Sequence, residues 1–331
     1  MTKTAVAIVL GDPAGVGPEL IAKLIAIPAN QAKADILVIG EPSELEEGMR
    51  IAGVCFDYNI VLERPSSVDN GVTVWHEHSR RNKKFERAVA TRDGGLYCLD
   101  ALRRAIEITM SGVTQSVLFG PLNKSSLHLA GMRFADESQW FADLLGVTDC
   151  PHGELNYLEG LWTSRVTSHI ALKDVSPQIT RGRIVDSIRL VFEAALAAGI
   201  ANPRIAVCGL NPHNGENGSF GREEIDTISP AIEEARTQGL PVVGPFPADT
   251  IFLRVREFDG IVTMYHDQGQ IAIKLLGFSG GVTVHGGLPI TISTPAHGTA
   301  FDIYGHGKAD PRAMQAAFDV GLALAAKNAR P

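Results

Sequence analysis

The sequence predicts an α/β protein with two α/β/α domains, mainly parallel sheets and a cleft between the domains. The first observation is the length, because 331 residues suggest about two domains at roughly 150 residues each. The second is that short apolar runs alternate with helical stretches, which is typical of βαβ units. The third is that glycine, proline and histidine follow several of these runs, at the strand ends where α/β proteins bind ligands.

Short apolar runs mark the strand candidates. In chain order they are 6–10, 36–39, 116–119, 165–168, 205–210 and 261–265. Helical periodicity predicts helices over 18–27, 96–110, 183–198, 222–238 and 311–328. The last of these has a clear start signal, because Asp310 is a good N-cap and Pro311 fits the first helical turn.

The first strand candidate leads into a glycine-rich turn, GDPAGVGPEL at residues 11–20. Such a turn often holds a nucleotide, but the dinucleotide fingerprint G-x-G-x-x-G fails because Leu20 stands where the third glycine belongs. The phosphate-binding loop fails as well, since no Gly-Lys-Ser/Thr closes the turn. A nucleotide, if the protein uses one, must therefore be bound in another way.

Charge and hydropathy exclude several classes of partner. The net charge is −7 and no basic stripe is interleaved with aromatic residues, which argues against nucleic acid. The densest basic cluster, RRNKK at 80–84, is expected to be a solvated loop or helix face. No apolar run approaches 18 residues, so we expect neither a membrane span nor a signal peptide. The four cysteines form no C-x-x-C pair and indicate reduced core thiols in a cytoplasmic protein.

Three of the predicted strands are followed by a histidine: His169, His213 and His266. A single histidine is more often structural than a ligand, but recurrence at three strand ends favours a shared site. Three neutral imidazoles suit a divalent cation with open positions for substrate oxygens. The spacings are not those of a local metal motif, so the fold must bring the rings together. Asp267 is expected to orient His266 or to be a further ligand.

The segment HGTAFDIYGHGKADP at 297–311 combines small residues, repeated glycines and an acid. This composition suits a backbone that wraps closely around a flat ligand. An ordinary turn that leads into the C-terminal helix is the alternative, and periodicity does not separate the two.

Ordered motifs over nearly the whole chain resemble one family. They are GDPAGVGPEL, GPLNK, AGMRF, TSH, CGLNPHNGE, GPFPADT, MYHDQG, IKLLGF and HGTAFDIYGHGKAD. This set resembles the 4-hydroxythreonine-4-phosphate dehydrogenase family of vitamin B6 synthesis, which shares the fold of the isocitrate and isopropylmalate dehydrogenases. The resemblance implies a cofactor-side domain of residues 1–125 plus 285–331, and a metal, substrate and dimerisation domain of residues 126–284. It implies a homodimer with the active site at the interface.

The resemblance also implies roles for individual residues. His169, His213 and His266 would bind a divalent metal (Zn, Mg, Mn or Co), with one ligand from the partner subunit. Lys274 matches a lysine that contacts the substrate, and Asp249 matches an acid of the cleft. The segment at 297–311 is similar to an adenosine-binding loop for NAD, with NADP as the alternative. The residues expected to contact the cofactor are Gly298, Thr299, Asp302 and Asn211.

The substrate positions depart from the family pattern. A His-Thr pair is replaced by Glu137 and Ser138, and an asparagine and an arginine are replaced by Thr283 and Ile292. Losing an imidazole and a guanidinium while gaining carboxylates makes a poor phosphate pocket. Lys274 and Arg133 remain as cations there. We therefore expect a sugar acid or, by preference, a dihydrodiol carboxylate as substrate.

The expected reaction is hydride transfer from a carbinol carbon to NAD, with a metal ion that stabilises the developing alkoxide. A substrate with a carboxylate β to the new ketone would then lose carbon dioxide. Lys274 and Lys124 are the candidate bases, because a buried lysine near a cation can titrate close to neutrality. The alternatives are an isomerase or lyase on the same scaffold and a metabolite-binding protein without turnover.

Overall fold

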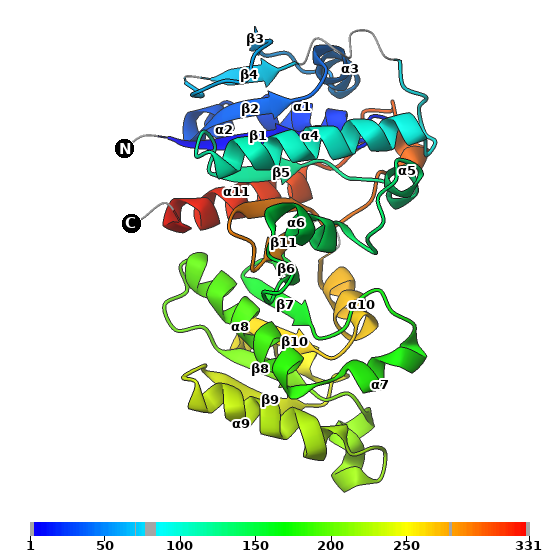
Figure 1. Ribbon diagram of the computed structural model, residues 1–331, viewed down its shortest axis with the longest axis vertical. Helices are drawn as coiled ribbons and strands as arrows, with labels where there is room; N and C mark the ends of the chain where they lie inside the picture. Colours follow the sequence, from blue (N-terminus) through cyan, green and yellow to red (C-terminus); the bar gives the residue numbers. More distant parts are fainter. Residues whose placement is uncertain (1–2, 70, 77–83, 278–279, 329–331) are drawn as a thin grey trace. The chain divides into compact units, whose positions relative to one another are not determined.

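The computed structural model describes residues 3–69, 71–76, 84–277 and 280–328 (Figure 1). The chain divides into two compact units, residues 1–134 with 289–331 and residues 135–288. Four residues of the predicted basic cluster, 80–83, lie outside the described residues.

The first unit holds six strands of the sheet, in the order β3-β4-β2-β1-β5-β12, and all neighbours within this order are parallel. Its strands are β1 Thr4–Val9, β2 Ala34–Ile39, β3 Asn59–Val61, β4 Val72–Trp75, β5 Ser116–Phe119 and β12 Thr291–Pro295. Strands β1, β2 and β5 are almost wholly apolar and buried, as expected of a parallel sheet covered on both faces.

Helices of the first unit pack on this sheet. They are α1 Gly17–Ile25, α2 Pro28–Lys33, α3 Pro42–Ala52, α4 Arg92–Met110, α5 Lys124–Leu129 and α11 Arg312–Asn328, with a 3₁₀ turn η7 Phe301–Ile303. Helix α4 packs on β1, β2 and β5, and α11 packs on β12, β5 and β1. The Asp310 carboxylate accepts the Arg312 backbone N–H at 3.0 Å, which confirms the predicted capping role of Asp310.

The second unit holds a mixed sheet in the order β11-β6-β7-β10-β8-β9. The strands are β6 Gly153–Leu158, β7 Leu161–Arg165, β8 Ile205–Cys208, β9 Val242–Phe246, β10 Gly260–Thr263 and β11 Val282–Gly286. Strand β6 is antiparallel to both of its neighbours, while β7, β10, β8 and β9 are parallel. The carboxyl ends of these four strands therefore share one edge.

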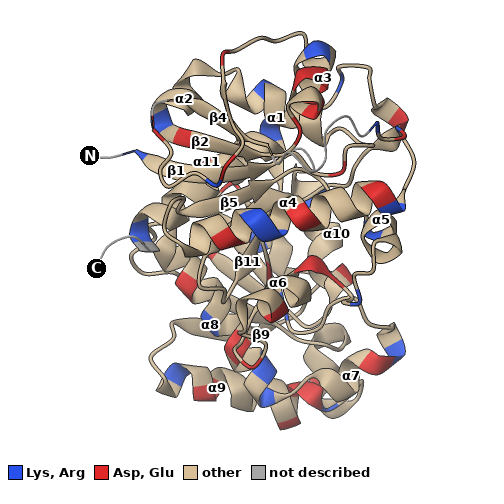
Figure 2. Cartoon of the chain, turned by 45° about the horizontal axis from the view of Figure 1, so that its top comes forward, with Lys and Arg blue, Asp and Glu red and all other residues tan. Residues whose placement is uncertain are grey.

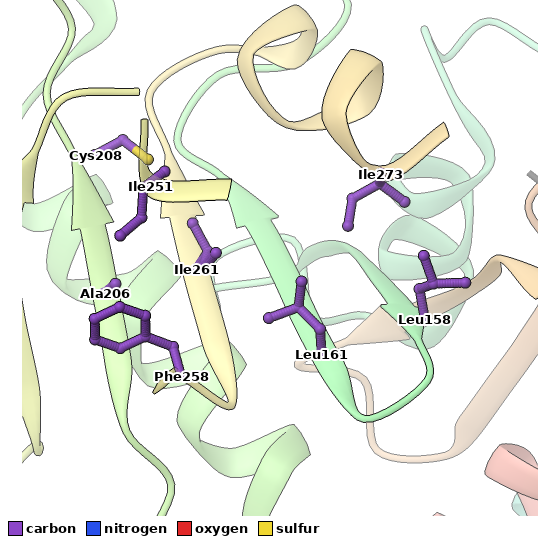
Figure 3. Close-up of a cluster of buried hydrophobic side chains, with 8 residues drawn as sticks. All are labelled: Leu158, Leu161, Ala206, Cys208, Ile251, Phe258, Ile261 and Ile273. Carbon is purple, nitrogen blue, oxygen red and sulfur yellow. The ribbon is translucent and has the colours of Figure 1, made fainter. Parts of the chain in front are cut away.

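The second unit's α-helices are α6 Glu137–Leu145, α7 Val175–Gln178, α8 Arg181–Ala197, α9 Ser229–Thr237 and α10 His266–Gly277. Its other helical segments are η2 Leu172–Asp174, η3 Pro212–Gly218, the π-helical turn η4 Glu224–Ile228 and η5 Ile251–Glu257. One face of the sheet is covered by α10 and η5. Ile273 of α10, Ile251 of η5 and Phe258, which follows η5, pack with strand residues in a buried cluster (Figure 3). Helix α8 packs on β7, β10 and β8 and against α9.

Two of the predicted elements differ in the structure. The strand predicted at 165–168 is wrong by nearly its whole length, because β7 runs from Leu161 to Arg165. Its sequence LWTSR is apolar only at the first two positions, so it contains no apolar run of strand length. The helix predicted at 222–238 begins with the π-helical turn η4 and becomes α-helical only in α9. The strands β3, β4, β6, β9, β11 and β12 were not predicted.

The four cysteines differ in their burial. All four cysteines are free, but only Cys98 and Cys208 are buried, so the expectation of core thiols is wrong for Cys55 and Cys150. Figure 2 shows acidic and basic residues on the same helices, for example α4. Among the described residues, no helix is long and apolar enough to cross a membrane.

Candidate active site

The carboxyl edge of the second unit's sheet carries the three predicted histidines. His169 follows β7, His213 follows β8, and His266 is the first residue of α10 after β10. Because these strands are parallel neighbours in the order β7-β10-β8, all three loops leave the sheet at the same edge.

His169 and His266 lie next to each other, with ring centroids 5.7 Å apart. The Nδ1 atom of His169 bonds to Asp136 Oδ2 at 2.9 Å, and Nδ1 of His266 bonds to Asp267 Oδ1 at 2.7 Å. A carboxylate at Nδ1 fixes the ring and its tautomer, which leaves Nε2 as the ligand atom. Two imidazoles sharing one cation hold their centroids roughly 5 to 5.5 Å apart, given metal–nitrogen bonds of about 2.1 Å. The observed 5.7 Å is slightly longer than this separation, so the two rings lie almost close enough to share a divalent cation.

His213 is not part of this group of neighbouring rings, and within the described residues no hydrogen bond to a carboxylate fixes its ring. Its Nδ1 atom is 3.6 Å from Glu216 Oε2, and its exposed ring meets Phe220 edge-on. In the described part of one chain, the group of three potential metal-binding side chains whose ligand atoms all lie within 4.8 Å of one another is Asp136, Glu154 and His169. His213 is not in that group.

The backbone is strained at two of the three histidines. His169 has a φ of 51° and His213 a φ of 52°, and left-handed φ values continue through Asn217. Residues other than glycine rarely adopt a left-handed φ. Those that do cluster at functional sites.

A buried carboxylate holds the loop that carries His213. Glu224, in the π-helical turn η4, accepts the backbone N–H groups of Leu210 and Asn211, each at 2.7 Å. The Asn211 side-chain amide donates to Glu223 at 2.7 Å and to Glu224 at 3.0 Å. Asn211, predicted to contact the cofactor, is thus engaged in fixing this loop. The sequence reasoning missed Glu224, and no pattern in the chain distinguishes it from other helical glutamates.

A cavity of about 460 Å³ lies beside His169 within the second unit. Its lining includes Asp136, Ser138, Glu154, Arg165 and Arg183. Asp136 belongs both to this cavity and to the histidine site, since its Oδ1 caps α6 while its Oδ2 binds His169. The predicted residue Ser138 thus lies beside the candidate metal site.

In the first unit, the glycine turn at 11–20 contacts the segment at 297–311, which is predicted to bind the cofactor. The Val16 backbone N–H donates to the Thr299 carbonyl at 3.0 Å. A Cβ atom on Gly15 would lie 2.7 Å from the Thr299 Cβ and carbonyl oxygen, so only glycine allows this approach. The turn thus packs closely against the segment at 297–303 through Thr299.

The far end of the same loop is held by an ion pair on α1. Lys23 donates to Glu19 at 2.6 Å and to the Gly307 and Ala309 carbonyl oxygens, and Glu19 accepts the Ala309 N–H at 2.9 Å. Both ends of the segment at 297–311 are therefore fixed to α1 and the turn that precedes it. Gly298 and Asp302 remain exposed between these anchors.

Several predicted site residues have positions that change their interpretation. Lys274 and Lys124 are exposed, so the burial expected of a catalytic base is wrong for the single chain. Asp249 and Arg133 are exposed as well. Ile292 is 0% exposed in β12 and belongs to the core of the first unit, so we correct its predicted contact with substrate.

Thr283, on β11, accepts a hydrogen bond from Asn156 Nδ2 at 3.1 Å. Asn156 Oδ1 in turn accepts from Arg165 at 2.8 Å. Thr283 is thus connected to the buried polar network behind the cavity. Glu137 and Ser138, at the start of α6, are both buried.

His285, on β11, is buried in this region against the edge of the Phe141 ring. Burial lowers the pKa of His285 to about 4, although the charges of Glu154 and Asp136 act in the opposite direction. A lowered pKa favours the neutral ring in the folded state, so its contribution to stability is present above the ordinary value of 6.5 and lost as pH falls toward 4.

We therefore expect acid to destabilise the second unit in a way that depends on His285. The free energy of unfolding should fall by roughly 3 kcal/mol between pH 7 and pH 4, beyond the loss shown by His285→Gln. Urea unfolding of both proteins across this pH range measures the difference, with His128→Gln as an exposed control. Equal pH dependence in wild type and His285→Gln would contradict the assignment.

Together with its curated relatives, this arrangement defines the chain as a dehydrogenase, an oxidoreductase that acts on a CH–OH group. Residues 32–321 match the family described as pyridoxal phosphate biosynthetic protein PdxA, and the chain belongs to this family. The putative 4-hydroxythreonine-4-phosphate dehydrogenase 2 of Pseudomonas aeruginosa is 54% identical over 96% of both chains. The D-threonate 4-phosphate dehydrogenase of Salmonella typhimurium is 36% identical over 98% of this chain and 99% of its own.

Solved structures agree with the predicted fold class. The 4-hydroxythreonine-4-phosphate dehydrogenase of Klebsiella pneumoniae has a TM-score of 0.82 at 34% identity, covering 98% of both chains. A terephthalate 1,2-cis-dihydrodiol dehydrogenase of Burkholderia xenovorans has a TM-score of 0.67 at 26% identity, over 97% of this chain and 98% of that one. The isocitrate dehydrogenase of Methylococcus capsulatus is similar in fold alone, at 16% identity, a TM-score of 0.50 and coverage of 98% and 88%. The prediction of an isocitrate dehydrogenase-like α/β fold is confirmed.

Proposed function

We propose that the protein is a divalent-metal- and NAD-dependent dehydrogenase that oxidises the hydroxyl group of a small hydroxy acid. The observation that carries the proposal is the pair of His169 and His266, 5.7 Å apart, each with a carboxylate at Nδ1. A purely structural role would not require two neighbouring histidines at a strand edge, each with its ring oriented by a carboxylate. The arrangement is the one expected of first ligands to a cation.

His169 and His266, with His213 from a second copy of the chain, would hold the cation in our proposal. A divalent cation at this site would supply the positive charge that favours loss of a proton from a substrate hydroxyl. Asp136 and Asp267 keep the two rings in the tautomer that directs Nε2 at the site. The alternative group of Asp136, Glu154 and His169 is less suitable, because Asp136 and Glu154 already bind His169 and Arg165.

NAD, as hydride acceptor, would lie against the segment at 297–311, where Gly298 and Asp302 are exposed. The support is that this segment is fixed at both ends, by the glycine turn and by the pair of Glu19 and Lys23. A loop ordered before the ligand arrives loses little conformational entropy on binding. NADP remains the alternative cofactor.

Lys274 is our candidate for the group that accepts the substrate's hydroxyl proton, with Lys124 as the second choice. Lys274 lies eight residues after His266 on α10, a rise of roughly 12 Å along the helix. It is therefore too far along the helix to serve the site of its own His266. We infer that it acts on the site completed by a partner chain, which supports a homodimer.

The second unit presents apolar side chains suited to such an interface. Leu253 on η5 and Leu275 on α10 are 84% and 83% exposed, and Ile271 on α10 is 58% exposed. Both helical segments cover the same face of the sheet through their inner residues (Figure 3). Exposed large apolar side chains on two segments that cover the same face of the sheet favour a protein–protein contact there.

We predict that Leu275→Asp disrupts the dimer. A buried leucine contributes roughly 2 kcal/mol, so dimerisation should weaken by about 30-fold or more. Sedimentation equilibrium of wild type and variant measures the change, and Leu129→Asp, at a residue 55% exposed on α5, is the control. A monomeric wild type, or a variant that dimerises normally, would overturn this part of the proposal.

The reaction itself is tested by absorbance of reduced nicotinamide. The metal-loaded protein is incubated with NAD and a panel of sugar acids, their phosphates and dihydrodiol carboxylates. We expect turnover with at least one hydroxy acid, abolished by a chelator and restored by the cation. Absence of signal across the panel, with both cofactors and each candidate metal, would contradict a dehydrogenase.

A further inference from the structure

The cavity beside His169 has a lining that identifies the part of the substrate it would receive. This inference rests on the proposed function and concerns the same site. The charged residues of the lining are Asp136, Asp149, Glu154, Asp186, Arg165 and Arg183. Carboxylates thus outnumber guanidiniums by four to two, and a phosphate, with a charge of about −2 at neutral pH, would meet net repulsion.

The buried guanidinium in this cavity is already engaged. Arg165 Nη2 pairs with Glu154, Nη1 donates to Asn156 Oδ1 at 2.8 Å, and Nε donates to Ser168 Oγ at 2.9 Å. All three nitrogens therefore have partners within the second unit. Binding a phosphate bidentately would require breaking a buried ion pair, which is costly.

The helix that borders the cavity presents its side rather than its N-terminus. The residues Arg183, Asp186, Ser187 and Leu190 are spaced as i, i+3, i+4 and i+7 on α8. Anions bind to the unpaired N–H groups at the start of a helix, and α8 does not contribute these groups to the lining. Arg183 itself donates to Gln178 outside the cavity.

One group in the lining still needs a partner. Ser138 is 3% exposed, and its Oγ is a buried atom without a hydrogen-bond partner among the described residues. A buried hydroxyl without a partner costs about 1 to 3 kcal/mol, which a ligand can recover. Ser164, Ser168 and Ser187 also line the cavity. A ligand hydroxyl both donates and accepts, and therefore suits carboxylates and serines together.

We propose that this cavity binds an uncharged, hydroxyl-bearing part of the substrate and rejects a phosphate at the same position. The protein would thus act on a non-phosphorylated polyhydroxy acid. A volume of about 460 Å³ is adequate for a compact ligand of this kind. Asp136 lines the cavity and also binds His169, so the cavity and the histidine site are adjacent.

The test compares matched pairs of acids with and without a terminal phosphate. Threonate, erythronate and glycerate, each beside its phosphate ester, are titrated into the metal-loaded dimer in a calorimeter, without NAD. We expect at least one free acid to bind about tenfold or more tightly than its phosphate. Ser138→Ala should lower that affinity about tenfold through loss of the hydroxyl. Equal or tighter binding of the phosphates, or no binding by any free acid, would overturn the proposal.

Two variants that each remove a negative charge test whether the carboxylates of the lining cause this preference. Glu154→Gln releases Arg165 from its ion pair, so the preference for the free acid should fall about tenfold. Asp186→Asn removes a carboxylate without touching that pair and should act in the same direction. The exposed Asp143→Asn, on α6 outside the lining, is the matched control and should leave the preference unchanged.

An unchanged preference in both charge variants would also overturn the proposal. The two proposals fail separately, since binding is measured without turnover. Tighter binding of the free acids in the calorimeter, without reduction of nicotinamide by any of them, would refute only the proposal of a dehydrogenase. Turnover of phosphates in preference to free acids would refute the cavity assignment alone.

Discussion

Replacing His213 by alanine is expected to abolish metal-dependent turnover while the protein remains folded. His213 lies on an exposed turn with left-handed φ values, so its side chain makes little contribution to the core. Loss of one of three ligands removes most of the charge stabilisation that the cation supplies. That stabilisation amounts to several kcal/mol, which corresponds to a decrease in kcat on the order of 1,000-fold.

The measurement combines the rate of nicotinamide reduction with metal content after dialysis. His128→Ala is the matched control, because His128 is an exposed histidine on α5 whose Nδ1 contacts only the Met132 carbonyl among the described residues. Mixing His213→Ala with His169→Ala subunits adds a test of the interface. If His213 acts across the dimer, mixed dimers should regain activity in one of their two sites. Full activity of His213→Ala alone would remove this histidine from the site.

Adding one methyl group at Gly15 is expected to displace the cofactor loop. The new Cβ would lie 2.7 Å from both the Cβ and the carbonyl oxygen of Thr299, and neither backbone can yield without moving the segment at 297–303. A displacement of about 1 Å at a binding site can lower catalytic efficiency by roughly 100-fold. We therefore expect Gly15→Ala to lower kcat/KM for NAD by that order.

Calorimetric titration of NAD into Gly15→Ala separates loss of binding from loss of chemistry. Metal content should stay at the wild-type level, because the histidines belong to the other unit. Gly182→Ala adds the same methyl group where nothing lies within 4 Å and serves as the control. Normal NAD affinity in Gly15→Ala would show that this loop does not bind the cofactor.

Much of the secondary structure followed from local patterns. Apolar runs located β1, β2, β5, β8 and β10, and periodicity located α1, α4, α8 and α11, because these elements are buried on both faces or on one regular stripe. The sequence pattern did not locate strands such as β6 and β7, because they mix polar and apolar residues. Asn156 and Arg165 on these strands face a polar network whose members come from separate segments. No local pattern distinguishes such strands from loops.

The sequence by itself determined the α/β class, the histidines at the ends of three strands and the absence of the dinucleotide fingerprint from the glycine turn. These features depend on residue type and on the few positions around each residue. Only the tertiary structure decided that Asp136, 33 residues before His169, orients its ring, and that Glu154 occupies Arg165. It also placed Thr299 against Gly15 and put Ile292 in the core. The physical reason is that such contacts join segments far apart in the chain, and their geometry is set by the packing of the sheet rather than by sequence spacing.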